Sequence, residues 1–195
     1  LPIKVVPNLD MTSKLKVMIT CLSFKNFTGS EMYVFELAKG LRKLNCEVTV
    51  VSTIGGPLTT MANKIGIKTL GFTEFPGFKL GDGKWGFDTV QGVQPSKAGV
   101  MYKVSDPDYD IIHVQHKNIT DKVVEVYPKI PKIATIHSEV IALENPVKDK
   151  TIVNYITIRP EIQNHIINVH GIPEENTQVI YNPIDDTRFN TKGIK

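Results

Sequence analysis

A glycine-bearing turn opens the first helix that the sequence predicts, directly after the first predicted strand. The turn reads Cys21-Leu-Ser-Phe-Lys-Asn-Phe-Thr-Gly29-Ser30-Glu31, and Thr28 or Ser30 is a good N-cap. Free N–H groups at a helix N-terminus, together with the helix dipole, suit a phosphate or a developing anion. An ordinary capped helix with a glycine turn is the alternative. The chain has no G-x-G-x-x-G and no Walker pattern, so neither type of nucleotide-binding loop is expected.

Two histidines follow predicted strands at positions where they can reach a ligand. His116 lies just past the strand over 109–114, and His137-Ser138-Glu139 directly follows the strand over 132–136. Ligands of open parallel sheets bind beyond the carboxyl ends of the strands. The His137 imidazole can therefore donate to a sugar hydroxyl or a phosphate. The alternative is that His137 or Ser138 only caps the following helix.

Other polar residues have a structural role as one possible explanation, and the motifs of metal sites and serine hydrolases are absent. His113 alternates into its strand, and we expect a hydrogen-bonded core residue. Arg159 precedes a helix with Pro160 at its first position, and it can either bind an anion or pair with a surface carboxylate. No H-x-x-x-H or cysteine cluster suggests a metal, and no Gly-x-Ser-x-Gly suggests a serine hydrolase.

Alternating strands and helices must position these side chains. Short apolar, β-branched segments alternate with segments whose apolar residues recur at helical spacing. The predicted strands cover 15–20, 47–53, 67–71, 109–114, 132–136, 153–158 and 178–181, and the predicted helices cover 31–44, 57–65, 121–127 and 160–169. Crossover connections between about seven strands imply a Rossmann-like α/β fold, a doubly wound parallel sheet with helices on both faces.

Residues 72–106 break this pattern. Glycines punctuate the segment, and its aromatic residues show no periodicity. A loop of this length in a compact α/β domain is usually functional or disordered, so we expect a mobile flap over a binding cleft or an irregular insertion. Residues 95–104 can form one helix within it.

The composition describes one soluble domain. The chain has 195 residues, of which 41% are hydrophobic, and no apolar run is long enough to cross a bilayer. A net charge of +3 from scattered lysines does not form the basic face of a nucleic-acid-binding protein. Cys21 and Cys46 fall at opposite ends of neighbouring strands, so we expect free thiols and a reducing, cytoplasmic compartment. Residues 1–14 are an extension without the layout of a signal peptide.

Several motifs together resemble the amino-terminal domain of the family 4 glycosyltransferases. They are Gly29-Ser-Glu-Met-Tyr-Val-Phe-Glu-Leu-Ala-Lys-Gly-Leu, Cys46-Glu-Val-Thr-Val-Val, Tyr109-Asp-Ile-Ile-His, Ala134-Thr-Ile-His137, Gly171-Ile-Pro and Val179-Ile-Tyr-Asn-Pro-Ile-Asp185 with Phe189. The resemblance implies a GT-B fold, in which two Rossmann-like domains face each other across a cleft. It also implies a retaining reaction that needs no metal or other cofactor, with the nucleotide sugar as a substrate.

The same resemblance assigns roles to individual residues. Gly29 and Ser30 become the backbone site beside the donor phosphate or sugar, and His137 becomes the histidine near the transferred sugar. His116, Ser138, Glu139 and Arg159 are candidates for the acceptor side of the cleft. Residues 15–181 form the acceptor-side domain, and 182–195, with Asn182, Pro183 and Asp185, begin the linker to a donor-binding domain that is absent.

The sequence also departs from the family pattern. Thr28-Gly29 stands where the family usually has Gly-Gly, which narrows the room for a phosphate, and Arg159 stands where it usually has Ser. The Glu-x7-Glu motif of the donor-binding half does not occur. We therefore expect the isolated chain to bind little sugar nucleotide and to transfer almost none.

Two classes of function remain at this point. In the first, the chain is half of a glycosyltransferase with a sugar, glycan or lipid-linked acceptor, completed by a second domain in cis or in trans. A lipid acceptor would add peripheral membrane contact. In the second, it is a non-catalytic module that binds a glycan or nucleotide. A weaker third interpretation is a generic flavodoxin-like nucleotide binder.

Overall fold

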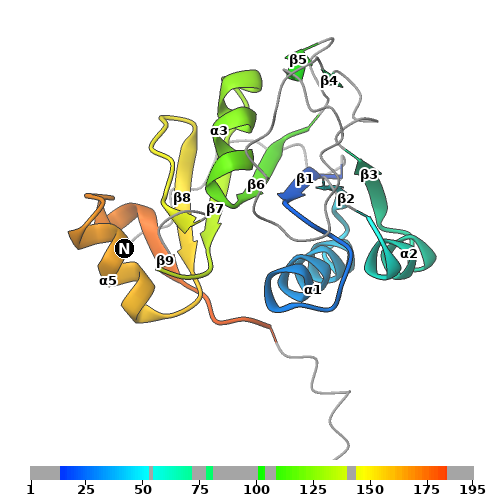
Figure 1. Cartoon of the computed structure of the whole chain (residues 1–195), viewed down its shortest axis with the longest axis horizontal. Helices are drawn as coiled ribbons and strands as arrows, with labels where there is room; N and C mark the ends of the chain where they lie inside the picture. Colours follow the sequence, from blue (N-terminus) through cyan, green and yellow to red (C-terminus); the bar gives the residue numbers. More distant parts are fainter. Residues whose placement is uncertain are drawn as a thin grey trace, which may run out of the picture.

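A seven-stranded parallel sheet forms the centre of the molecule (Figure 1). The computed structural model describes residues 14–52, 55–71, 78–80, 101–103, 109–139 and 144–183. The sheet has the order β3-β2-β1-β6-β7-β8-β9, and all neighbouring pairs are parallel. Its strands are β1 (Lys16–Cys21), β2 (Glu47–Ser52), β3 (Lys68–Gly71), β6 (Ile111–Gln115), β7 (Lys132–Ile136), β8 (Ile152–Thr157) and β9 (Thr177–Val179). The predicted Rossmann-like α/β fold is confirmed.

The helices are also close to their predicted positions. They are α1 (Gly29–Lys43), α2 (Pro57–Lys64), α3 (Lys117–Val126) and α5 (Pro160–Asn168), followed by the 3-10 turn η1 (Glu174–Asn176). Helix α2 starts with Pro57, where a missing N–H costs nothing. Before it, Gly56 lets the chain pass Lys25, since an added Cβ would lie 2.5 Å from the Lys25 Cγ. Helix α3 begins four residues earlier than the predicted 121, because His116 turns the chain directly from β6 into the helix.

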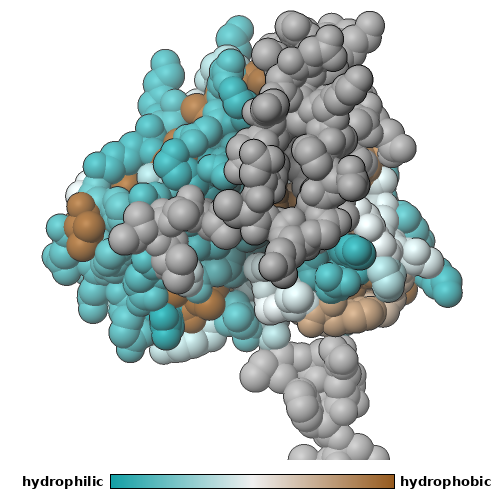
Figure 2. Space-filling model, in the orientation of Figure 1, coloured by the Kyte–Doolittle hydropathy of each residue, from teal (hydrophilic) through white to brown (hydrophobic). Residues whose placement is uncertain are grey.

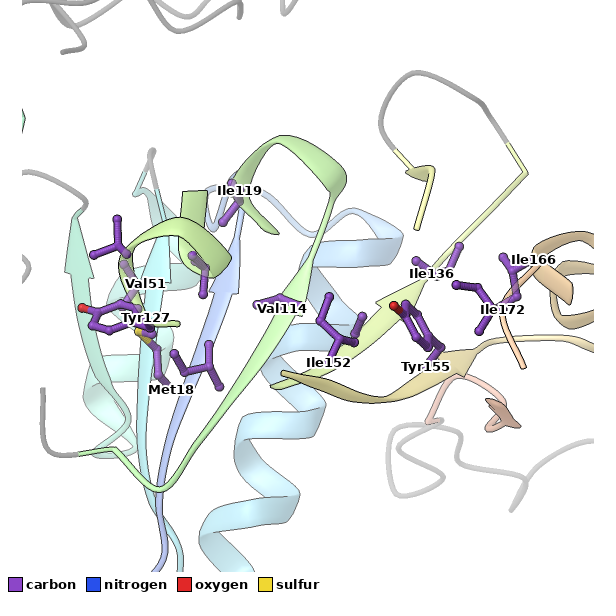
Figure 3. Close-up of a cluster of buried hydrophobic side chains, with 14 of the residues drawn as sticks. Met18, Val51, Val114, Ile119, Tyr127, Ile136, Ile152, Tyr155, Ile166 and Ile172 are labelled. Carbon is purple, nitrogen blue, oxygen red and sulfur yellow. The ribbon is translucent and has the colours of Figure 1, made fainter. Parts of the chain in front are cut away.

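The helices cover the two faces of the sheet with two separate cores. On one face, α1 and α2 bury Val34, Ala38 and Leu58 against β1 and β2. On the other face, α3 and α5 bury Ile119 and Ile166 against β6, β7 and β8, as Figure 3 shows. Because both faces of the central strands are removed from water, most of their buried residues are apolar, and His113, Gln115 and Thr135 are polar exceptions on the face toward α1.

The two halves of the sheet are wound in opposite directions. The chain moves outward from β1 through α1, β2 and α2 to β3, then returns to β6 beside β1 and moves outward again to β9 (Figure 1). Right-handed crossovers then put α1 and α2 on one face and α3 and α5 on the other. The order reverses between β1 and β6, which makes the carboxyl ends of these two strands the topological switch point of the sheet.

Two short strands occupy part of the segment 72–106, where no regular pattern was predicted. β4 (Phe78–Leu80) and β5 (Met101–Lys103) pair antiparallel in a second sheet. The predicted helix over 95–104 is wrong at its last residues, since strand pairing with β4 replaces helical hydrogen bonds there. The rest of the predicted flap and the predicted extension, apart from residue 14, lie outside the described residues.

The two thiols and the molecular surface fit the sequence interpretation. Cys21 ends β1, Cys46 precedes β2, and both are free as predicted. Outside the atoms drawn in grey, the face in Figure 2 is mostly hydrophilic, with hydrophobic residues in separate small groups. No helix in the described part of the chain has the length and apolarity needed to cross a bilayer.

Candidate functional site at the switch point of the sheet

The candidate residues meet at the carboxyl edge of the sheet, around the switch point. The turn before Gly29 follows β1, His116 follows β6, His137 follows β7 and Arg159 follows shortly after β8. Because β1, β6, β7 and β8 are adjacent and parallel, these connections leave the sheet on the same edge. The structure therefore brings together residues that the chain separates by more than a hundred positions.

His137 is held by three neighbours. Its Nε2 lies 2.6 Å from the Oε1 of Gln115 at the end of β6, and its backbone N–H donates to the Oε2 of Glu144 at 3.0 Å. The ring of Tyr33, one turn after Gly29 in α1, meets the His137 ring edge to face with centroids 5.0 Å apart. Tyr33 thus connects the first turns of α1 with the imidazole.

The three histidines of this region are neutral near pH 7. Burial lowers the pKa of His113 and of His116 to about 4. Burial, and then the neighbouring His116 and His113, lower the pKa of His137 to about 3. An imidazole without charge carries one N–H donor and one acceptor nitrogen. His137 can therefore exchange hydrogen bonds with a hydroxyl group, but it does not present a positive charge.

Glu144 is a site residue that the sequence analysis missed. Its side chain is 8% exposed, and its Oε1 lies 3.6 Å from the Nε2 of His116. Burial raises the pKa of Glu144 to about 7, with the His137 N–H opposing this shift. Since the pKa of His116 is lowered at the same time, the two groups do not form a fully charged ion pair near neutral pH. A carboxyl group at the end of the apolar run 140–143 is the signal that could have singled it out.

His116 has an uncommon backbone conformation. Its φ of 62° and ψ of 128° lie outside the regions that side chains other than glycine readily adopt. Its carbonyl accepts from the backbone N–H and the hydroxyl of Thr120, which fixes the first turn of α3. The buried Nδ1 has no hydrogen-bond partner among the described residues. Strained residues of this kind concentrate at functional sites.

His113 is the core residue that its alternation predicted. It is 6% exposed, and its Nε2 lies 2.6 Å from the hydroxyl oxygen of Thr135 on β7. The same oxygen lies 3.1 Å from the Tyr33 hydroxyl. This buried group of three ties α1 to the sheet below the candidate site.

The turn before α1 is organised by Glu31. The carboxylate of Glu31 accepts from the Ser23 hydroxyl at 2.5 Å, the Lys25 N–H at 3.1 Å and the Thr28 hydroxyl at 2.6 Å. Burial alone would raise the pKa of Glu31, but these hydrogen bonds together lower it below its ordinary value. Glu31 is therefore an anion that holds residues 23–28 in one conformation.

Gly29 has no structural requirement for glycine. It is the first residue of α1, its φ is not in the left-handed region, and a Cβ added to it would meet no atom of the described residues within 4 Å. Ser30 follows it in the same exposed first turn and is half-buried. The absence of a side chain at Gly29 leaves open space beside the helix N-terminus.

Arg159 and Glu139 form an exposed ion pair. The Arg159 Nη2 lies 2.8 Å from the Glu139 Oε2, and the two side chains are 50% and 33% exposed. Pairing with a surface carboxylate was one of the two predicted roles of Arg159. Ser138 is half-buried between His137 and Glu139, and a capping role for it depends on residues 140–143, which lie outside the described residues.

The chain leaves the sheet after β9. The Ile180 N–H donates to the Thr157 carbonyl at 2.9 Å, and Asn182 and Pro183 follow in an exposed segment. Asp185, the third predicted linker residue, lies outside the described residues. No group of three or more His, Cys, Asp or Glu in the described part of the chain is arranged to hold a metal ion.

Residues 27–188 match the model of Glycosyltransferase Family 4. The chain belongs to this family. The match covers Gly29 and Ser30, the three histidines of the site, and Asn182, Pro183 and Asp185, so the resemblance read from the motifs is confirmed. A comparison with curated proteins found no match.

Solved structures support the fold of this family 4 domain. A glycosyltransferase from Rickettsia africae ESF-5 superposes with a TM-score of 0.56 at 13% identity, covering 93% of this chain and 46% of that one. HepE from Anabaena, in complex with UDP and glucose, superposes with a TM-score of 0.55 at 16% identity, covering 89% and 46%. These are GT-B glycosyltransferases, and the family 4 domain spans a little under half of their length.

Proposed function

We propose that this family 4 domain is the acceptor-side half of a glycosyltransferase that moves a sugar from a nucleotide-sugar donor to a sugar, glycan or lipid-linked acceptor. A donor-binding domain, on the same chain or on another, completes it. The observation that carries the proposal is the meeting of the α1 N-terminus and the neutral His137 at the switch point of the sheet, joined through Tyr33. The neighbour HepE was solved with UDP and with UDP-glucose, which supports a nucleotide sugar as the donor.

Each half of the site has a chemical task in this proposal. When the sugar is transferred, negative charge grows on the leaving nucleoside diphosphate. The N–H groups of Gly29 and Ser30 and the dipole of α1 stabilise that charge. Gly29 lets the phosphate or sugar approach the backbone, since no neighbouring atom fills the space beside it. His137 exchanges a hydrogen bond with a sugar hydroxyl.

The other polar residues of the edge support the acceptor side. His116 follows β6, Ser138 and Glu139 follow β7, and Arg159 follows β8. An acceptor hydroxyl or anion binds among them. To bind an anion, Arg159 leaves its ion pair with Glu139 and pairs with the ligand instead. The ion pair with Glu139 is weak because both side chains are exposed to solvent. The proposed reaction retains the anomeric configuration and requires no metal.

Two exposed apolar side chains lie where a second domain could contact this one. Phe27, beside the turn, is 60% exposed, and Tyr181, beside the linker residue Asn182, is 68% exposed. Phe27 and Tyr181 mark a contact surface only as parts of one contiguous apolar patch, because single exposed apolar residues are common on any protein. We propose that they face the donor-binding domain and that the protein acts in the cytoplasm, where its thiols stay reduced.

Calorimetric titration and an activity assay test this function together. Titration of the chain alone with a panel of sugar nucleotides is expected to show little binding, and micromolar binding would contradict the proposed division of labour. The chain is then combined with a Rossmann-like domain bearing paired glutamates, from its own reading frame or a neighbouring one. Sugar transfer by the combination supports the enzyme, whereas glycan binding without transfer favours the non-catalytic module.

A further inference from the structure

Polar side chains line the side of β6 and β7 that faces α1. In the register of these strands His113 lies opposite Ile133 and Gln115 opposite Thr135. Since alternate residues of a strand share a face, His113, Gln115, Thr135 and His137 lie on one side of the sheet. Tyr33 of α1 contacts this side through Thr135 and through the His137 ring.

Gln115 makes the one side-chain hydrogen bond of the His137 ring within the described residues. Gln115 is 1% exposed, and its Oε1 lies 2.6 Å from the His137 Nε2. In the amide orientation of this structure Oε1 faces the ring, and the buried Gln115 Nε2 has no hydrogen-bond partner among the described residues. A carboxamide oxygen only accepts hydrogen bonds, so with this orientation the imidazole nitrogen that faces it carries the proton. In a neutral imidazole the other nitrogen, Nδ1, is then an acceptor.

The surroundings keep the ring neutral, which this argument requires. Glu144 directs one oxygen to the His137 backbone N–H and the other toward His116, so neither oxygen of this carboxyl group is bonded to the His137 ring. The other ring neighbours are Tyr33 and His116, at centroid distances of 5.0 Å and 6.0 Å. Burial lowers the pKa of His137 to about 3, which agrees with this arrangement.

We propose that Gln115 is a positioning residue, which fixes His137 in the Nε2–H tautomer so that Nδ1 presents a lone pair. The group that binds at Nδ1 must donate a hydrogen bond to this lone pair. A sugar hydroxyl meets this condition, while a fully ionised phosphate does not. This reverses the simpler expectation that the imidazole donates to its ligand, and it rests on the proposed function only for the identity of that ligand as a sugar.

Nitrogen NMR of the histidine rings in the full chain tests the tautomer directly. The His137 signals are assigned by their loss in His137→Asn. In the native chain near pH 7, Nε2 is expected to show the shift of a protonated nitrogen and Nδ1 that of an unprotonated one. In Gln115→Met, which keeps the length of the side chain without an acceptor, the Nε2–H to Nδ1–H ratio should fall roughly five- to tenfold.

Two further variants separate positioning from folding. Thr20→Val alters another buried polar side chain near the same edge, on the opposite face of the sheet, and should leave the His137 signals unchanged. Gln115→Glu places a carboxylate oxygen at the same position, which favours a charged ring, so both His137 nitrogens should show protonated shifts in this variant. An unprotonated Nε2 in a folded Gln115→Glu would show that residue 115 does not contact the ring through this nitrogen. A protonated Nδ1 in the native chain, or an unchanged ratio in a folded Gln115→Met, would overturn the proposal. The NMR measurement uses the chain without any sugar donor or sugar acceptor. Its result therefore does not depend on whether the chain is part of a glycosyltransferase.

Discussion

The carboxyl group of Glu144 joins the connections that follow two neighbouring strands. Its Oε2 accepts the backbone N–H of His137 at 3.0 Å, and its Oε1 lies 3.6 Å from the Nε2 of His116. One buried side chain thus sets the distance between the two histidines of the candidate site, whose rings stack with centroids 6.0 Å apart. The position of His137 depends on a residue seven positions further along the chain.

Glu144→Ala is expected to destabilise the fold by about 1–3 kcal/mol, because it leaves the His137 N–H without its acceptor. Glu144→Gln keeps an acceptor oxygen and should cost clearly less. Urea unfolding followed by circular dichroism measures both. Glu125→Ala, which removes an exposed carboxylate paired with Lys122, is the control and should change the stability by less than about 0.5 kcal/mol. Equal losses in the Glu144→Ala and Glu125→Ala variants would show that Glu144 does not support the site.

Stability should depend on pH through the buried histidines and Glu144. His113, His116 and His137 have folded pKa values of about 4, 4 and 3, below the ordinary 6.5, so between about pH 5 and 6 the unfolded chain binds nearly three more protons through them. Glu144, with a folded pKa of about 7 against 4.5, binds one more proton in the folded state over the same range. The net difference of two protons, three minus one, makes stability rise with pH by on the order of 2–3 kcal/mol per unit.

Urea unfolding at several pH values between 4.5 and 7 measures this slope, and Glu144→Gln supplies the comparison. Without the carboxyl group the opposing proton is lost, so the rise with pH should steepen toward three protons. Because Glu144 binds its extra proton only up to its folded pKa of about 7, the slopes of the native chain and this variant should converge above that pH. A native chain whose stability does not change between pH 4.5 and 6.5 would mean that the histidines are not buried in neutral form.

The sequence carried enough information for the sheet but not for the contacts within the site. Mostly apolar strands and Pro or Gly at element ends follow local rules, which is why β1, β2 and α5 lie within two residues of their predicted bounds. His137 was found because strand ends in a parallel sheet share one edge. Gln115 was missed because its contact with His137 depends on the register of β6 and β7. Glu144 was missed because the chain must fold back after β7 to bring this residue beside the His137 N–H. The alternation of His113 and Gln115 within an apolar strand was the available signal of a polar face.

The Arg159–Glu139 pair is expected to contribute little to stability. Both side chains are substantially exposed, and pairs of this kind contribute about 0–1 kcal/mol. The free energies of unfolding of Arg159→Ala and of Glu139→Ala should each lie within about 0.5 kcal/mol of the native value. In the double variant the two changes should add, with almost no coupling free energy. If Arg159 binds an anionic group of the substrate, only its own substitution raises the KM of the completed enzyme. A coupling free energy well above 1 kcal/mol would instead identify the pair as structural.

Gly29→Ala tests whether glycine is needed at this position for ligand binding or for folding. An added Cβ at Gly29 meets no atom of the described part of the chain within 4 Å, and the residue is already helical, so alanine should leave stability unchanged or raise it by about 0.4–1 kcal/mol. Gly40, later in α1, also has open space around an added Cβ, which makes Gly40→Ala a matched control. If the donor phosphate or sugar approaches the backbone at Gly29, transfer by the completed enzyme should fall at least about tenfold in Gly29→Ala, since a misplacement of the substrate by a methyl group is costly. Gly40→Ala should keep full activity. Steady-state kinetics and thermal unfolding of the two variants provide the comparison, and full activity in a stable Gly29→Ala variant would remove the α1 turn from the proposed donor site.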